Sequence, residues 1–155
     1  ERRNKESEEI REKRKGDALM ENRMYVNAIR VYQKLLEKDS REISREMRER
    51  ILHNQGCAYS YLFQMDKALD CFFAAWKVNQ SEKALKIYLL AYRSVHTPEE
   101  FEKIQEDLKA EDSVKKETAR ALEQFISLPE QKIAPGETDR ILEDLTREYH
   151  RSTGS

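Results

Sequence analysis

Apolar and small residues recur along this chain at an interval of forty positions. The recurring positions are Gly16, Leu19, Ala28 and Tyr32 in a first unit, and Gly56, Tyr59, Ala68 and Phe72 in a second. Around them the apolar residues follow one another at spacings of three and four, which is typical of one face of an α-helix. The pattern predicts two similar helical hairpins, which bury their apolar faces by stacking on each other.

Helix start signals and breaks divide the chain further. We expect a first hairpin over 17–38 that turns near 22–25, a long helix from about Arg41 to Phe63 capped by Ser40, and a strongly apolar helix from Asp66. A third hairpin is expected over 81–96 and 98–108, where Thr97, Pro98 and Glu100 form a capping box. A seventh helix starts at Asp112 or Ser113. The predicted organisation is a charged helical extension over 1–15, a repeat domain over 16–127, a linker over 128–137 and a capping or docking helix over 138–150.

The composition supports an all-α fold. Hydrophobic and charged residues each make up 38% of the chain, and only four glycines and three prolines interrupt it. Long helices need this scarcity, because inside a helix glycine costs about 1 kcal/mol and proline about 3 kcal/mol. An all-β fold is excluded by the lack of turn residues and of period-two alternation.

Charge and cysteine content limit the compartment and the partner. The formal net charge is −1 with both signs interleaved, which disfavours nucleic acid as the partner. Cys57 and Cys71 form no CxxC pair and suit a reducing compartment, so we expect a cytoplasmic protein. No apolar run is long enough to span a membrane within these residues. The chain opens at Glu1 rather than methionine, so it is compatible with a fragment, and an upstream membrane anchor stays open.

The second unit resembles the tetratricopeptide repeat. Its residues at that family's characteristic positions are Leu52, Gly56, Tyr59, Ala68, Phe72 and Ala75. The first unit keeps Gly16, Ala28 and Tyr32 but has Glu12 where a large apolar residue is usual. The family's period is about 34 residues, and we attribute the extra residues here to 40–45, as a longer start of the third helix. The resemblance implies a right-handed α-solenoid of stacked antiparallel hairpins with about seven to eight helices.

In that family the first helix of each unit lines a concave groove that binds a peptide or helical segment. Carried onto this chain, the resemblance implies a partner-binding groove formed by Lys13, Asp17, Met20, Glu21, Arg50, His53, Asn54, Cys57 and Tyr61. The members from residue 50 onward share one helix face by their spacing alone. The alternative for them is an ordinary solvated face with a partly buried cysteine.

Some members of the family hold a terminal carboxylate with a lysine–asparagine set, which Lys13 and Asn54 match in part. Asp17 stands where another asparagine is usual, and its carboxylate would repel that of the ligand. We therefore do not expect capture of a terminal carboxylate.

Candidate chemistry is sparse. The three histidines have no metal-ligand spacing and no phosphate-binding loop is present, so we expect no cofactor, no metal and no enzyme activity. His53 and Cys57 lie four residues apart on one predicted helix, which is close enough for thiolate activation. A cysteine of the core or groove is the favoured interpretation, because no third orienting group is indicated.

These features favour a non-catalytic module or scaffold that binds another protein, with no small-molecule substrate. One alternative is an oligomerisation subunit, in which the terminal helices pair with copies of the chain. A weaker alternative is RNA binding through Arg41, Arg45, Arg48 and Arg50, which is disfavoured because glutamates lie between them.

Overall fold

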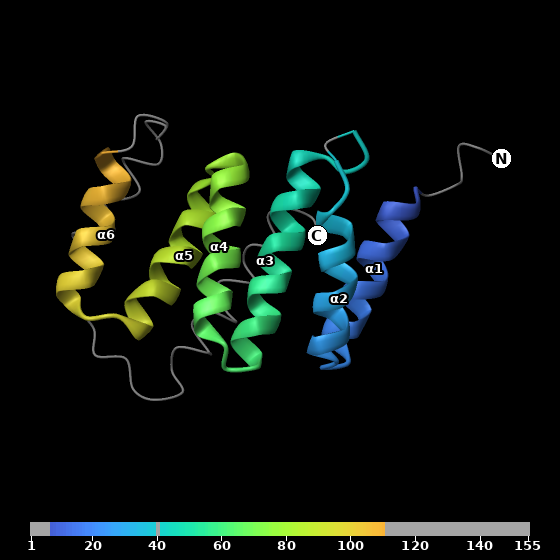
Figure 1. Cartoon of the computed structure of the whole chain (residues 1–155), viewed down its shortest axis with the longest axis horizontal. Helices are drawn as coiled ribbons and strands as arrows, with labels where there is room; N and C mark the ends of the chain where they lie inside the picture. Colours follow the sequence, from blue (N-terminus) through green and yellow to red (C-terminus); the bar gives the residue numbers. More distant parts are fainter. Residues whose placement is uncertain (1–6, 40, 111–155) are drawn as a thin grey trace. The chain divides into compact units, whose positions relative to one another are not determined.

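A computed structural model of the chain describes residues 7–39 and 41–110. Within these residues the protein is all-helical, with six α-helices and no strand (Figure 1). The chain divides into two compact units, residues 1–79 and 80–155, which are described separately. None of the helices in the described part is long and apolar enough to cross a membrane. The predicted helices from 112 and over 138–150, and the linker between them, lie outside the described residues.

The first unit consists of two helical hairpins. The helices are α1 (Glu8–Glu21), α2 (Tyr25–Leu36), α3 (Arg45–Tyr61) and α4 (Met65–Asn79). They lie side by side in chain order, and each is antiparallel to its neighbour along the chain (Figure 1). Residues 8–15 of the expected charged extension belong to α1, which runs unbroken across residue 15. Lys38 Nζ lies 3.5 Å from Glu9 Oε1, so the charged turns of α1 contact the end of α2.

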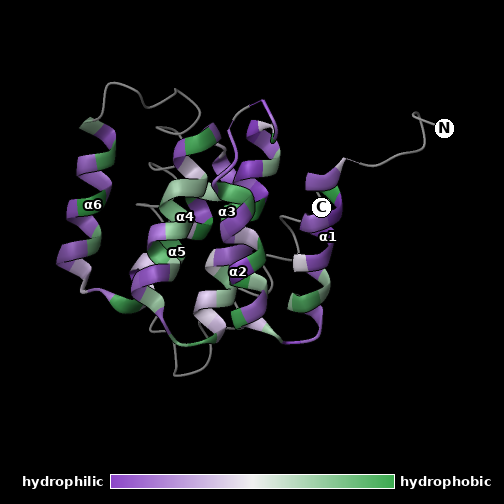
Figure 2. Ribbon diagram, turned by 45° about the vertical axis from the view of Figure 1, so that its right-hand side comes forward, coloured by the Kyte–Doolittle hydropathy of each residue, from purple (hydrophilic) through white to green (hydrophobic). Residues whose placement is uncertain are grey.

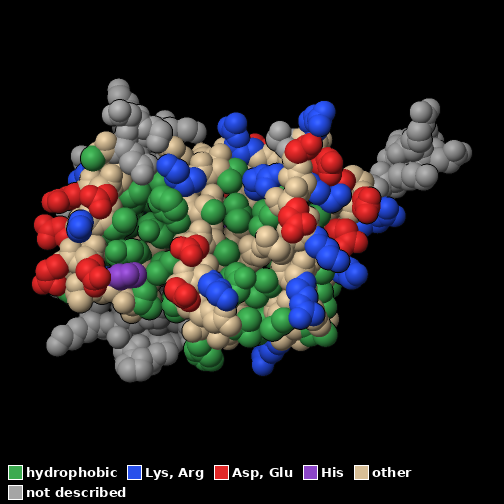
Figure 3. Space-filling view, viewed as in Figure 1, with side chains coloured by type: hydrophobic (Ala, Val, Ile, Leu, Met, Phe, Trp, Pro, Cys, Tyr) green, Lys and Arg blue, Asp and Glu red, His purple; other side chains and the backbone are tan. Residues whose placement is uncertain are grey.

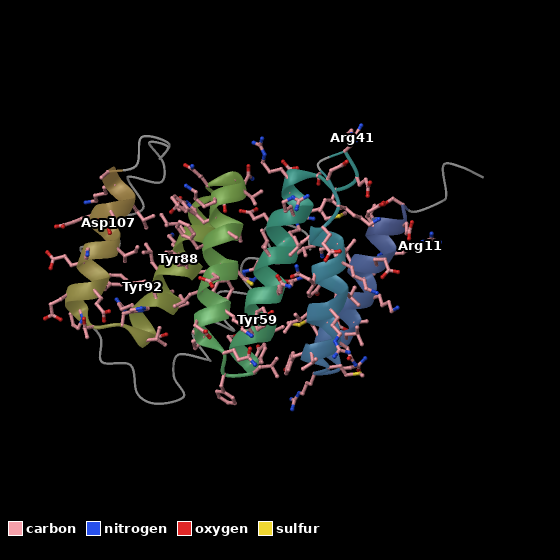
Figure 4. All side chains as sticks on the ribbon, viewed as in Figure 1. Arg11, Arg41, Tyr59, Tyr88, Tyr92 and Asp107 are labelled. Carbon is pink, nitrogen blue, oxygen red and sulfur yellow. The ribbon has the colours of Figure 1, made fainter. Side chains whose placement is uncertain are left out.

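The start of α3 differs from the sequence prediction. Ser44, not Ser40, caps the helix, with its hydroxyl oxygen 3.1 Å from the amide nitrogen of Met47. Arg41 and Glu42 form a turn before this cap. The carboxylate of Asp39 accepts the amide hydrogen of Arg41 at 2.9 Å, and the Asp39 carbonyl accepts that of Glu42. The extra residues of the forty-residue period therefore lengthen the connection between α2 and α3 rather than α3 itself. Arg41 lies at the top of this connection in Figure 4.

In each hairpin the two helices cross closely at a glycine. A Cβ atom on Gly16 would stand 2.6 Å from Cε1 of Tyr32, and a Cβ atom on Gly56 would stand 2.6 Å from Cε1 of Phe72. Tyr32 is fully buried and Phe72 is 2% exposed, so neither ring has room to move away. Each glycine therefore lets the two helices of its hairpin approach more closely than any other residue would.

The two hairpins also turn in the same way. After α1 the amide of Met24 donates to the carbonyl of Leu19, and after α3 the amide of Gln64 donates to that of Tyr59. These bonds define a Schellman turn, whose key residue takes the left-handed conformation. That residue is Arg23 in the first hairpin and Phe63 in the second, and each has a φ of 60°.

The core of the first unit contains the residues that the repeat pattern selects. Ala28, Tyr32, Leu35 and Ile51 form one buried cluster. Four residues of α4 are at most 3% exposed, so this helix is a main contributor to the core: Ala68, Phe72, Ala75 and Trp76. In Figure 2 the first turns of α1 are mostly purple, whereas α4 is pale or green along much of its length.

The second unit includes α5 (Glu82–Val95) and α6 (Pro98–Ala110), as predicted. The capping box between them is formed: the amide of Glu100 donates to the hydroxyl of Thr97 at 3.2 Å, and the amide of Thr97 donates to the carboxylate of Glu100 at 3.0 Å. Two tyrosines one turn apart on α5, Tyr88 and Tyr92, have ring centroids 5.9 Å apart (Figure 4). Leu85 and Leu89 are fully buried.

Candidate functional site

Three of the predicted groove residues meet in a polar network with one core residue. Asp17 of α1 is its centre. The Tyr32 hydroxyl of α2 donates to Asp17 Oδ1 at 2.5 Å, and Asn54 Nδ2 of α3 donates to the same oxygen at 3.1 Å. Lys13 Nζ lies 2.8 Å from Asp17 Oδ2. The network therefore joins the first three helices through one carboxylate.

The network is largely removed from water. Lys13 is 9% exposed, Asn54 6% and Tyr32 not at all. Burial, followed by the charge of Asp17 and the hydrogen bond to it, raises the pKa of Tyr32 well above its ordinary value. The stable arrangement here is a neutral Tyr32 that donates its hydrogen to the Asp17 carboxylate, and this hydrogen bond stabilises the fold.

This geometry gives Lys13 and Asn54 partners inside the fold, and their role in a groove stays a prediction. Both were expected to face a partner, and their spacing matched a carboxylate-binding set in part. Both side chains donate hydrogen bonds to the carboxylate of Asp17. The charge argument against terminal-carboxylate capture thus gains a structural reason: the two donors are already bonded inside the fold.

His53 and Cys57 lie next to each other, as their spacing predicted. The distance from His53 Nε2 to Cys57 Sγ is 3.5 Å, and the imidazole lies 5.7 Å from the ring of Phe72. His53 is 2% exposed and Cys57 6% exposed. Both side chains are therefore buried in the structure, and their role in a groove stays a prediction.

The remaining predicted groove residues reach the surface to different degrees. Met20 and Arg50 are half-buried, and Glu21 is exposed. Tyr61 is exposed at 39% and stacks on Tyr25 of α2, with ring centroids 4.9 Å apart and an angle of 14° between the rings. Tyr61 is the one aromatic member of the predicted set that a partner can touch.

Tyr61 belongs to an apolar surface that the sequence analysis missed. The large apolar residues exposed around the two hairpin turns are Met24 at 46%, Val26 at 51% and Phe63 at 84%. Together with the stacked pair they define what we call the turn-end surface: Met24, Tyr25, Val26, Tyr61 and Phe63. Figure 3 shows hydrophobic side chains gathered over the lower ends of α2 and α3. A signal for it was present, since the forty-residue shift places Phe63 on the turn position of Arg23.

The arginines considered for RNA binding are partly engaged in the fold. Arg48 donates from its two terminal nitrogens to the carbonyls of Leu36 and Lys38, at 3.1 Å and 2.6 Å. It thus satisfies carbonyl groups at the end of α2, which otherwise lack partners. Arg41 bonds to Asp39 at 3.2 Å.

Comparison with protein-family models, with curated proteins and with solved structures finds no match to this chain. The resemblance to tetratricopeptide repeats accordingly rests on the residues quoted above. Inference of function depends on the chain's own surface and contacts.

Proposed function

We propose that this chain is a non-catalytic module that binds another protein through the turn-end surface. The observation that carries the proposal is Phe63, which is 84% exposed beside the stacked Tyr25–Tyr61 pair. Aromatic side chains are enriched in the energetically dominant positions of protein interfaces. Apolar side chains gathered at one end of a fold are typical of an interaction site.

The proposal keeps the predicted class of function and moves the site. Four of the expected groove residues are buried or bonded internally, so little of their surface can contact a ligand: Lys13, His53, Asn54 and Cys57. The turn-end surface instead presents rings that are already held in place. Ordering such rings on binding costs little side-chain entropy.

We further propose a tetratricopeptide-like solenoid of about seven to eight helices as the architecture. Its support is the repetition of three local features at forty-residue spacing. These are the glycine–ring crossing, the Schellman turn and the small residues Ala28 and Ala68 that are fully buried. Helical-repeat proteins of this kind bind other proteins on their extended surfaces.

Affinity capture with two contrasting variants tests the proposed site. The turn-end variant is Tyr61→Ser with Phe63→Ser, and the groove variant is Arg50→Glu; circular dichroism must show that both fold. We expect captured proteins to be lost with the turn-end variant and retained with the groove variant. Loss with Arg50→Glu alone would return the site to the groove and contradict the proposal.

The alternative of an oligomerisation subunit is separated by light scattering over a range of concentrations. A molecular mass that stays monomeric agrees with binding to a different protein. A mass that rises with concentration, and no longer does so in the turn-end variant, would mean that the surface binds a second copy.

A further inference from the structure

The helix beside the turn-end surface is cationic. From Tyr25 to Leu36, α2 carries Arg30 and Lys34 and contains no acidic residue. Both side chains are exposed, as is Arg23 in the preceding turn. Arg30 and Lys34 follow Val26 at steps of four residues, so the three side chains share one face of the helix. The positive charges thus lie directly beside the turn-end surface.

These three cations are unpaired in the described part of the chain. Some other basic groups there are neutralised: Lys13 lies 2.8 Å from Asp17, and Lys38 lies 3.4 Å from Glu42. Within residues 7–39 and 41–110, no carboxylate forms an ion pair with Arg23, Arg30 or Lys34. An anionic group on a partner would therefore meet them without displacing an internal ion pair.

Phe63 is unfavourable for the fold in two ways. Its ring is 84% exposed, so it gains little from burial. Its φ of 60° places a bulky residue in the left-handed region, where glycine is the usual choice at the end of a helix. Folding alone gives no reason for a phenylalanine here, whereas an apolar anchor for a partner does.

We propose that the turn-end surface binds an acidic segment of another protein that carries a bulky apolar side chain. The inference rests on the proposed function and specifies the chemistry of the partner. The apolar side chain packs against Phe63 and Tyr61, and the carboxylates of the segment face Arg23, Arg30 and Lys34. On α4 the exposed Asp66 and Asp70 offset its lysines, whereas α2 has no acidic residue, so α2 is the favoured path for an acidic segment.

A display library of random peptides is the probe. Selection uses the full chain, with counter-selection against Phe63→Gly, and the enriched peptides are measured by fluorescence anisotropy at low and high salt. We expect enrichment of sequences with several Asp or Glu residues around a Leu, Phe or Trp. Their affinity falls with added salt, because exposed charge pairs are screened.

Matched variants separate the contribution of the apolar side chains from that of the positive charges. Phe63→Gly and Arg23→Gly each remove a side chain from the same left-handed turn position. We expect Phe63→Gly to weaken binding about tenfold or more at any salt concentration. Arg23→Gly and Lys34→Glu weaken it chiefly at low salt. Arg45→Glu reverses an exposed charge at the opposite end of the hairpins and leaves binding unchanged.

The possible outcomes distinguish the two proposals. Enrichment of neutral or basic peptides that still depend on Phe63 would overturn the acidic partner and leave the protein-binding function standing. No enrichment above the Phe63→Gly background would overturn both. Association of the wild type with itself, or with vesicles of anionic lipid in preference to the peptides, lost in Phe63→Gly, would also overturn the inference by naming a different occupant.

Discussion

Gly16 lies against the ring of Tyr32 so closely that no side chain fits between them. The ring fills the space that a Cβ atom of residue 16 would take, at 2.6 Å from Cε1. Forty residues later Gly56 and Phe72 repeat the arrangement, with Cβ of Cys71 also 3.2 Å from the added atom. The same crossing thus sets the distance between helices in both hairpins.

Gly16→Ala and Gly56→Ala should each destabilise the protein. Alanine favours a helix over glycine by about 1 kcal/mol, but overpacking a core costs about 1–3 kcal/mol. Because the facing rings are buried, we expect the overpacking to dominate. Urea unfolding followed by circular dichroism measures the balance.

Two further variants make this result specific. Lys15→Ala, at the exposed neighbouring position, should change stability little. Gly56→Ala combined with Phe72→Leu should cost less than the two single changes added together, since the smaller side chain makes room. A stabilising effect of either glycine substitution would show that the crossing is looser than described.

Tyr32 should make the protein sensitive to alkaline pH. Its pKa is raised in the folded state by burial and by Asp17, while in the unfolded chain it stays near its ordinary value of 10.0. Below that pH the tyrosine is protonated in both states. Above it the unfolded state loses the proton and the folded state keeps it, so stability falls as pH rises.

Tyr32→Phe tests this origin. At neutral pH we expect a loss of about 1–2 kcal/mol, because Asp17 and Asn54 lose a buried hydrogen-bond partner. Above pH 10 the difference between variant and wild type should shrink. Tyr59 and Cys71 shift in the same direction, but they are common to both proteins and cancel in the difference. An equal difference at all pH values would assign the alkaline sensitivity to other groups.

Cys71 should react slowly with thiol reagents. Burial, with smaller contributions from the charges of Asp70 and Cys57, raises its pKa from 9.0 to about 12. At neutral pH the thiolate is then roughly a thousand times rarer than for an ordinary cysteine, and the thiolate is the reactive form. Iodoacetamide labelling of a Cys57→Ala variant, compared with the same variant in urea, measures the effect. A native rate close to the rate in urea would show that Cys71 is not shielded.

Thr97→Ala should weaken the start of α6. The variant loses the hydroxyl that accepts the Glu100 amide, at a cost of about 1 kcal/mol for a helix cap. Hydrogen bonds from Thr97 lower the pKa of Glu100, so its contribution is present above the unfolded pKa and is lost as pH falls. Hydrogen exchange should therefore accelerate in the first turn of α6 and stay unchanged in α1 to α4. Faster exchange throughout the chain would contradict a local role for the cap.

Much of the helical framework follows from local sequence signals. The sequence alone reveals the two glycines, the capping box at Thr97 and the apolar face of α4, because each depends on residues within one or two turns of a helix. The start of α3 was wrong, since Asp39 and Ser44 offer competing side-chain oxygens to the backbone and only the tertiary structure selects between them.

The site was harder to predict because periodicity does not reveal which polar residues bond to each other. Lys13, Asp17 and Asn54 have the spacing of a groove, but the Tyr32 hydroxyl reaches Asp17 from α2 and the set closes on itself. Phe63 was read as the end of a helix. Its exposure depends on a left-handed turn that a bulky residue seldom adopts.

The most direct test of the account is the stability of Phe63→Gly without any ligand. If the phenylalanine is present for binding, glycine relieves the left-handed strain and should raise the free energy of unfolding. We expect a gain of about 0.5–1 kcal/mol, after allowance for the greater freedom of glycine in the unfolded chain. Urea unfolding of the full chain gives the number. A clear loss of stability would mean that the Phe63 ring supports the fold, and the turn-end surface would then lose its central residue as a binding site.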